Sequence, residues 1–161
     1  MNKAKTLPHP TKTPTDKIHL IFPASPNGVR KALADTLEKL RFLELSIEET
    51  GTVELVLAEV MNNITEHAYA DYPDGMIDLQ ITPTSRGLYC KVSDSGKPMP
   101  KGAAPLGSRA LLDCELNDLP EGGFGWFLIR DLARDLEYSR VAGKNLLNFR
   151  IATNQPDLLA N

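Results

Sequence analysis

The sequence predicts an α/β fold, an α+β two-layer sandwich with helices on one face of a mixed, largely antiparallel sheet. Three observations support this prediction. Apolar residues recur at helical spacing in three segments. In two hairpin-like segments they alternate with polar residues instead. The strands of each hairpin follow one another directly and are not separated by helices, which disfavours a doubly wound parallel sheet. The 161 residues allow one domain. We place it at residues 17–152, after a flexible segment 1–16 and before a polar tail 153–161.

The chain is expected to begin its ordered part with a short strand, His19–Pro23, and then a helix. Ser25 and Pro26 have the residue types of a helix N-cap and a first helical position. Apolar residues then continue at helical spacing, so this helix is expected to end near Phe42.

A second helix is expected after a capping box formed by Ser46 and Glu49. Gly51 weakens its first turn, which leaves Thr50 as the alternative start. The apolar stripe that predicts burial of one face consists of Val53, Val56, Leu57, Val60 and Ile64.

The second half of the chain changes to a period of two and then contains a long loop. Strands Ile77–Thr82 and Leu88–Val92 are joined by a turn over Pro83–Gly87. Residues 98–121 are interpreted as a functional lid, since a long loop inside a compact domain is otherwise a sign of wrong assignment. The last expected elements are a helix over Phe124–Arg134, apolar at Phe124, Phe127, Leu128 and Leu132, and a hairpin of Leu136–Val141 and Leu146–Ile151 around Gly143.

Composition excludes several classes of function. A net charge of -3 and only 6% aromatic residues argue against a nucleic-acid partner, which requires a basic surface or stacking platforms. The sequence contains no membrane-length apolar run and no secretory signal, so no membrane association is expected. Cys90 and Cys114 are too few for a disulfide framework, and Cys90 has the pattern of a buried strand residue. We therefore expect a cytoplasmic protein.

One face of the second helix carries polar groups that suit chemistry on a phosphate. At 100° per residue, Glu59, Asn62, Asn63, Glu66 and His67 fall on one arc, with no Lys or Arg between Thr52 and Tyr69 to balance the acids. A carboxylate can accept a proton, and an amide oxygen suits Mg²⁺. Taken alone, such a face is more often simply solvated.

Two glycine-containing segments follow at positions where a ligand could approach the backbone. Asp94 and Gly96 end a strand, where a carboxylate can accept a hydrogen bond from an exocyclic amino group, although taken alone they are better explained by an ordinary turn. The segment 122–125, Gly-Gly-Phe-Gly, precedes an apolar helix, and free N–H groups at a helix start suit phosphate. Each motif is weak alone, and their order and separation make them informative.

Together the motifs resemble the histidine-kinase-like (GHKL, Bergerat-fold) ATPase superfamily, and within it the anti-sigma-factor serine/threonine kinases of the RsbW and SpoIIAB type. Leu57–Tyr69 resembles the N box, Asp94–Pro98 the first glycine box, and Gly122–Ile129 the second glycine box. The segment from Gly143 to Asn145, with the strand that follows, resembles the closing hairpin. The resemblance covers about residues 18–151 and implies a Bergerat ATP-binding fold.

The resemblance also implies roles for individual residues. Glu59 would be the general base, Asn63 would hold Mg²⁺ on ATP, and Asp94 would bind the adenine amino group. Gly96 would let the backbone approach the adenine ring. The residues that would line the triphosphate are Gly123 and Gly125.

In function, the resemblance implies a serine/threonine protein kinase that phosphorylates a STAS-type anti-sigma-factor antagonist. Many members sequester a sigma factor when that antagonist is absent, so a sigma factor is a second expected partner, and members often form homodimers. One departure concerns charge, because Glu121 stands where some members have a basic residue, and neither Arg109 nor Lys97 is fixed by a motif as its substitute. The alternative function is a non-catalytic, nucleotide-gated binding module that sequesters a regulatory partner. A blander alternative is an α/β domain whose motifs are coincidental.

Overall fold

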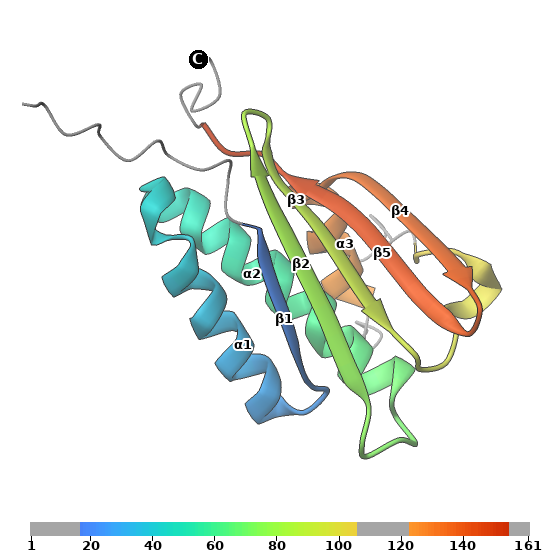
Figure 1. Cartoon of the computed structure of the whole chain (residues 1–161). Helices are drawn as coiled ribbons and strands as arrows, with labels where there is room; N and C mark the ends of the chain where they lie inside the picture. The colour runs from blue at the N-terminus through green and yellow to red at the C-terminus, as the bar shows by residue number, and fades with distance from the viewer. Residues whose placement is uncertain (1–16, 106–122, 155–161) are drawn as a thin grey trace, which may run out of the picture.

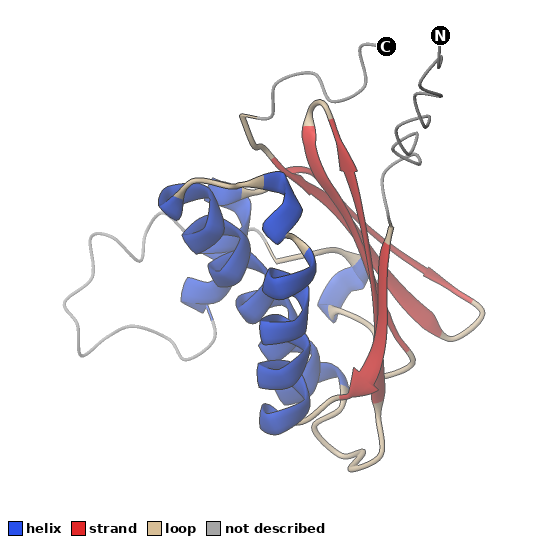
Figure 2. Ribbon diagram, turned by 60° about the vertical axis from the view of Figure 1, so that its left-hand side comes forward, coloured by secondary structure: helices blue, strands red, loops and turns tan. Residues whose placement is uncertain are grey.

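The computed structural model describes residues 17–105 and 123–154. Three helices lie on one face of a five-stranded sheet, and the opposite face of the sheet has no helix among the described residues (Figure 1, Figure 2). The predicted two-layer α/β sandwich is therefore confirmed. The segment 1–16 predicted to be flexible, and most of the predicted lid and tail, lie outside the described residues.

The sheet has the strand order β1-β2-β3-β5-β4, and every described pairing is antiparallel. Its inward-facing side chains alternate along each central strand and form the core with the helices. Cys90 is buried in this core, as predicted, whereas Cys114 lies outside the described part of the chain. The strands are β1 Ile18–Pro23, β2 Met76–Thr84, β3 Gly87–Asp94, β4 Arg134–Val141 and β5 Lys144–Ile151.

The first helix, α1 (Pro26–Lys39), begins where the sequence predicts. The Ser25 hydroxyl accepts a hydrogen bond from the Gly28 N–H at 3.0 Å, and Pro26 is the first helical residue. The helix ends at Lys39 rather than near Phe42, because the chain tightens into a 3₁₀ turn over Arg41–Leu43 that buries Leu43. The predicted C-terminal end is therefore wrong by about one turn.

The second helix, α2 (Ile47–Asn63), is capped at Ser46, and Thr50 is thereby excluded as its start. The Ser46 hydroxyl accepts from the Glu49 N–H at 3.1 Å, and the Glu49 carboxylate accepts from the Ser46 N–H at 2.8 Å. The same carboxylate accepts from the Asn154 N–H, which ties this helix start to the chain beyond β5. These N–H groups hold the pKa of Glu49 below its ordinary value, that of Asn154 most strongly. All residues of the predicted apolar stripe are buried.

The third helix, α3 (Gly123–Leu132), buries a different face from the one predicted. Trp126 and Ile129 point into the core, whereas Phe127 and Leu128 are only half-buried. The segment is apolar on nearly every side, so periodicity could not select the buried face. The helix also ends before Arg134, which is the first residue of β4.

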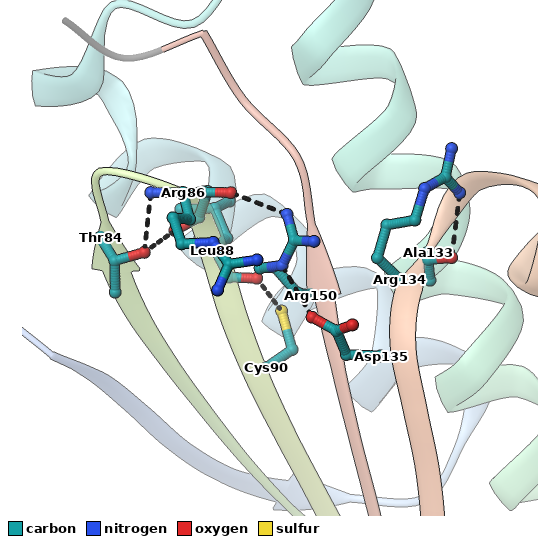
Figure 3. Close-up of polar contacts among 9 residues, drawn as sticks. Thr84, Arg86, Leu88, Cys90, Ala133, Arg134, Asp135 and Arg150 are labelled. Carbon is teal, nitrogen blue, oxygen red and sulfur yellow. Dashed lines mark hydrogen bonds and ion pairs between the residues drawn. The ribbon is translucent and has the colours of Figure 1, made fainter.

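At the end of the sheet remote from the α3 N-terminus, side chains connect the β2–β3 turn to β5 (Figure 3). The Thr84 hydroxyl donates to the Gly87 carbonyl and accepts from the Arg86 N–H. Arg150 then donates to the Arg86 carbonyl at 3.0 Å and to the Asp135 carboxylate at 2.9 Å. Asp135 lies in the register irregularity between β4 and β5, so Arg150 fixes both the hairpin turn and this irregularity.

Among the described residues, no helix is long and apolar enough to cross a membrane.

Candidate functional site

A cavity of about 400 Å³ lies between the C-terminal part of α2, the start of α3 and the loop that follows β3. Its wall is mostly apolar, which suits a flat aromatic ligand with a few polar contacts. The apolar lining includes Ile64, Met99, Trp126 and Leu147, and the polar lining includes Asn63, His67, Asp94 and Asn145.

Asp94, the last residue of β3, is 7% exposed and supplies a carboxylate to the lining of the cavity. Its Oδ1 accepts from the Gly96 N–H and from the Asn145 amide, both at 2.9 Å. Burial raises the pKa of Asp94, and these hydrogen bonds together with the charge of Arg140 act in the opposite direction. Among the described residues both of these donors contact Oδ1 and none contacts Oδ2, and Asp94 is one of the residues that line the cavity.

The turn after Asp94 packs closely on the end of α2, and this requires a glycine. A Cβ on Gly96 would lie 2.4 Å from the Ala68 carbonyl oxygen, which also accepts from the Lys97 N–H at 2.8 Å. The Tyr69 hydroxyl accepts from the Ser95 N–H at 2.7 Å and donates to the Met76 carbonyl. The turn is therefore held by the backbone and the tyrosine that follow α2.

Ala68 and Tyr69 reach this turn because α2 does not continue as an α-helix. Residues Ile64–Ala68 form a π-helical turn, in which the Tyr69 N–H donates to the Ile64 carbonyl. The 100° projection therefore fails beyond Asn63. His67, Asn62 and Glu66 are all exposed, and of the three only His67 is among the residues that line the cavity.

Glu59 and Asn63 meet the start of α3 at Gly125. A Cβ on Gly125 would lie 2.5 Å from Glu59 Oε2 and 3.7 Å from Asn63 Nδ2, so the glycine leaves room for the Glu59 carboxylate in this position. The two side chains are one turn apart on α2, as the sequence predicts. Gly123 is the first residue of α3, and its surroundings lie outside the described residues.

The charges that could neutralise a phosphate are few in the described part of the cavity. Only Lys97 and His67 among its described lining residues can be positively charged. Lys97 pairs with Asp71, and the hydrogen bond and charge of that carboxylate raise the pKa of Lys97. Arg109 and Glu121 lie outside the described residues.

Three polar residues of the β4–β5 hairpin, Tyr138, Arg140 and Asn145, contribute to the site although the sequence assigned none of them a role there, Asn145 being noted only as part of the closing hairpin. They form a hydrogen-bonded group behind Asp94, and Asn145 is 4% exposed. One signal could have found Asn145. It occupies an inward position of β5, in alternation with Leu147 and Phe149, where a polar side chain needs a buried partner.

The fold and the cavity define an α/β sandwich of the histidine kinase-like ATPase type. A family model described as the histidine kinase-like ATPase domain matches residues 22–151, and the chain belongs to this family. The resemblance to the histidine-kinase-like ATPase superfamily is thereby confirmed. No curated protein sequence matches the chain significantly.

Two solved structures illustrate the likeness of fold. The structure of the RsbU and RsbW domains of Rv1364c from Mycobacterium tuberculosis matches 92% of this chain with a TM-score of 0.59 and 15% identity. The blue-light activated histidine kinase EL346 from Erythrobacter litoralis matches 78% of the chain with a TM-score of 0.50 and 19% identity. The matches cover only 35% and 41% of those chains, respectively.

Asn63 fits the magnesium ion that this family implies. Its side-chain Nδ2 is buried and has no hydrogen-bond partner within the described part of the chain. Rotation of the amide would present its oxygen at the same place. Within residues 17–105 and 123–154, no group of three His, Cys, Asp or Glu side chains could hold a metal. Mg²⁺ takes one or two protein ligands and completes its shell with water and phosphate oxygens, so a single amide oxygen from Asn63 is a sufficient kind of ligand for it.

Proposed function

We propose that this protein is an ATP-binding serine/threonine protein kinase that acts as a partner-switching regulator or anti-sigma factor. Its substrate would be a serine of a STAS-type anti-sigma-factor antagonist, and a sigma factor would be its second partner. The observation that carries the proposal is the meeting of Glu59 and Asn63 at Gly125, because Asn63 also lines the cavity that contains the Asp94 carboxylate. We further propose a cytoplasmic location and a homodimeric assembly.

The nucleotide would lie with its base toward Asp94 and its phosphates toward the start of α3. Asp94 Oδ2 would accept from the exocyclic amino group of adenine, and Gly96 would leave room for the ring. Gly123 and Gly125 would present backbone N–H groups at the positive end of the α3 dipole to the phosphates.

Phosphoryl transfer would then depend on positioning and on removal of one proton. Glu59 would take the proton of the acceptor serine hydroxyl. The serine oxygen would bond to the γ-phosphorus while the bond from that phosphorus to the bridging oxygen breaks, which leaves ADP. Asn63 would hold Mg²⁺, which neutralises phosphate charge when bound.

One observation favours the alternative, a nucleotide-gated module that sequesters a partner without transferring phosphate. Of the two described cavity residues that can carry positive charge, Lys97 is already paired with Asp71. A site with little free positive charge stabilises a bound nucleotide more readily than a transition state that spreads charge over the γ-phosphoryl oxygens.

A substitution of Glu59 separates the two functions. Glu59→Gln should lower phosphate transfer from γ-labelled ATP to a STAS-type antagonist by about 10²-fold or more, because a general base contributes 10²–10⁴-fold. The affinity for ATP should stay unchanged. Glu54→Gln, at an exposed position of α2, is the matched control. Binding of ATP and partner without transfer by the wild-type protein would favour the module.

A further inference from the structure

The turn that carries Asp94 is also held from the opposite side, by the edge strand β4. The Tyr138 hydroxyl donates to Asn145 Oδ1 at 2.6 Å and accepts from the Met99 N–H at 3.0 Å. Arg140 Nη1 lies 2.7 Å from the same Asn145 oxygen and 2.9 Å from the Gly96 carbonyl oxygen, and donates to both. Tyr138 and Arg140, which we call the β4 clamp, thus contact both Asn145 and the backbone of the turn.

Asn145 is hydrogen-bonded through both its side-chain oxygen, which the clamp contacts, and its side-chain nitrogen. Its oxygen accepts from both clamp residues, and its amide nitrogen donates to Asp94 Oδ1 at 2.9 Å and to the Lys97 carbonyl at 2.8 Å. An amide with two acceptor and two donor positions occupied has one orientation that satisfies its neighbours. Asn145 therefore fixes Asp94 Oδ1, and only Oδ2 is left for a ligand.

We propose that Tyr138 and Arg140 are positioning residues that set the selectivity of the cavity for an adenine base. By fixing Asn145, they hold the Asp94 carboxylate with one oxygen toward the base as a pure acceptor. Such an acceptor favours the amino group at position 6 of adenine and opposes the carbonyl oxygen at the same position of guanine. This inference rests on the proposed nucleotide binding.

Arg140 also acts on the charge of Asp94. The other titratable groups that line this cavity near Asp94 are His67 on the π-turn, Lys97 on the turn itself and Tyr138 on β4. Lys97 is engaged by the carboxylate of Asp71. Burial raises the pKa of Asp94, and the positive charge of Arg140 acts in the opposite direction. Arg140 therefore favours the ionised carboxylate, which is the form that only accepts hydrogen bonds.

The chain supplies a matched control between the two clamp residues. Ser139 lies between them in β4, so its side chain faces the side of the sheet that no described helix covers. Tyr138→Phe removes one hydroxyl and keeps the ring, Arg140→Met removes the charge and both donors, and Ser139→Ala leaves the clamp intact.

The experiment measures the affinities for ADP and GDP by calorimetry over a range of pH. The wild type and Ser139→Ala should prefer ADP. Tyr138→Phe and Arg140→Met should bind ADP about tenfold more weakly, a change of about 1.4 kcal/mol, while their affinity for GDP changes little. In Arg140→Met alone, the loss of ADP binding on acidification should begin at a higher pH than in the wild type, because the charge that lowers the pKa of Asp94 is gone.

The outcomes are distinguishable. A wild-type protein that binds no ADP would overturn the proposed nucleotide binding itself. A wild type that binds ADP, with both clamp variants behaving like Ser139→Ala, would overturn the positioning role alone. Equal weakening of ADP and GDP would mean a general structural effect and would also overturn it. If Arg140→Met does not fold, Tyr138→Phe, which lacks a single oxygen atom, decides the selectivity.

Discussion

Gly125→Ala tests whether the position of the Glu59 carboxylate matters for transfer. The new Cβ would lie 2.5 Å from Glu59 Oε2, whereas ordinary van der Waals contact begins at 3.4 Å. The carboxylate would therefore have to retreat by about 0.9 Å, the difference between these two distances. A displacement of about 1 Å at a reacting group costs roughly 10²-fold in rate, so we expect transfer to fall by about that factor.

The same substitution should have little effect on the free energy of unfolding. Alanine is favoured over glycine in a helix by up to about 1 kcal/mol, and the atom that must move is the end of a flexible side chain. Gly51→Ala is the control, because a Cβ at Gly51 meets nothing within 4 Å in α2. It should raise the melting temperature by about 2–4 °C and leave transfer unchanged. The assays are transfer of labelled phosphate and thermal unfolding, and wild-type transfer by Gly125→Ala would refute this placement of the base.

Three further substitutions test the base-binding end and the capping of α2. Asp94→Asn should keep an oxygen acceptor but remove a buried charge, so the melting temperature should stay level or rise. The affinity for ADP, measured by calorimetry, should fall by about 10- to 100-fold. An unchanged affinity for ADP would contradict the role of the carboxylate. Gly96→Ala should lower the free energy of unfolding in urea by about 1–3 kcal/mol, because its Cβ would press on the Ala68 carbonyl oxygen, and a neutral result would contradict the close packing. Because the folded state lowers the pKa of Glu49, its charged form stabilises the fold above the ordinary value of 4.5, and this contribution is lost as pH falls through the lowered pKa. Glu49→Gln should therefore flatten the pH dependence of the melting temperature below about pH 5, and an unchanged acid profile would count against the link to Asn154.

Features specified by local chemistry were predictable from the sequence. The cap at Ser25 and the capping box of Ser46 and Glu49 depend on residues three positions apart, and the structure has both. The approach of Glu59 and Asn63 was also predictable, because it needs only the geometry of one helical turn.

Features that depend on tertiary contacts were not predictable in the same way. The π-helical turn over Ile64–Ala68 shifts every later side chain, and no residue within it marks the change from i→i+4 to i→i+5 bonding. The buried face of α3 is chosen by the core, because its sequence is apolar nearly all round. The hydrogen bonds among Tyr138, Arg140 and Asn145 depend on the pairing of β4 with β5 and on the turn after β3.

The most direct test of the account is detection of phosphoserine on a STAS-type antagonist after incubation with this protein, ATP and Mg²⁺. The account predicts a phosphoserine that forms with the wild type and with Glu54→Gln, and that is absent with Glu59→Gln although this variant still binds ATP. Phosphoserine formed equally by Glu59→Gln, or ATP-dependent binding of the antagonist by the wild type without any phosphoserine, would contradict it.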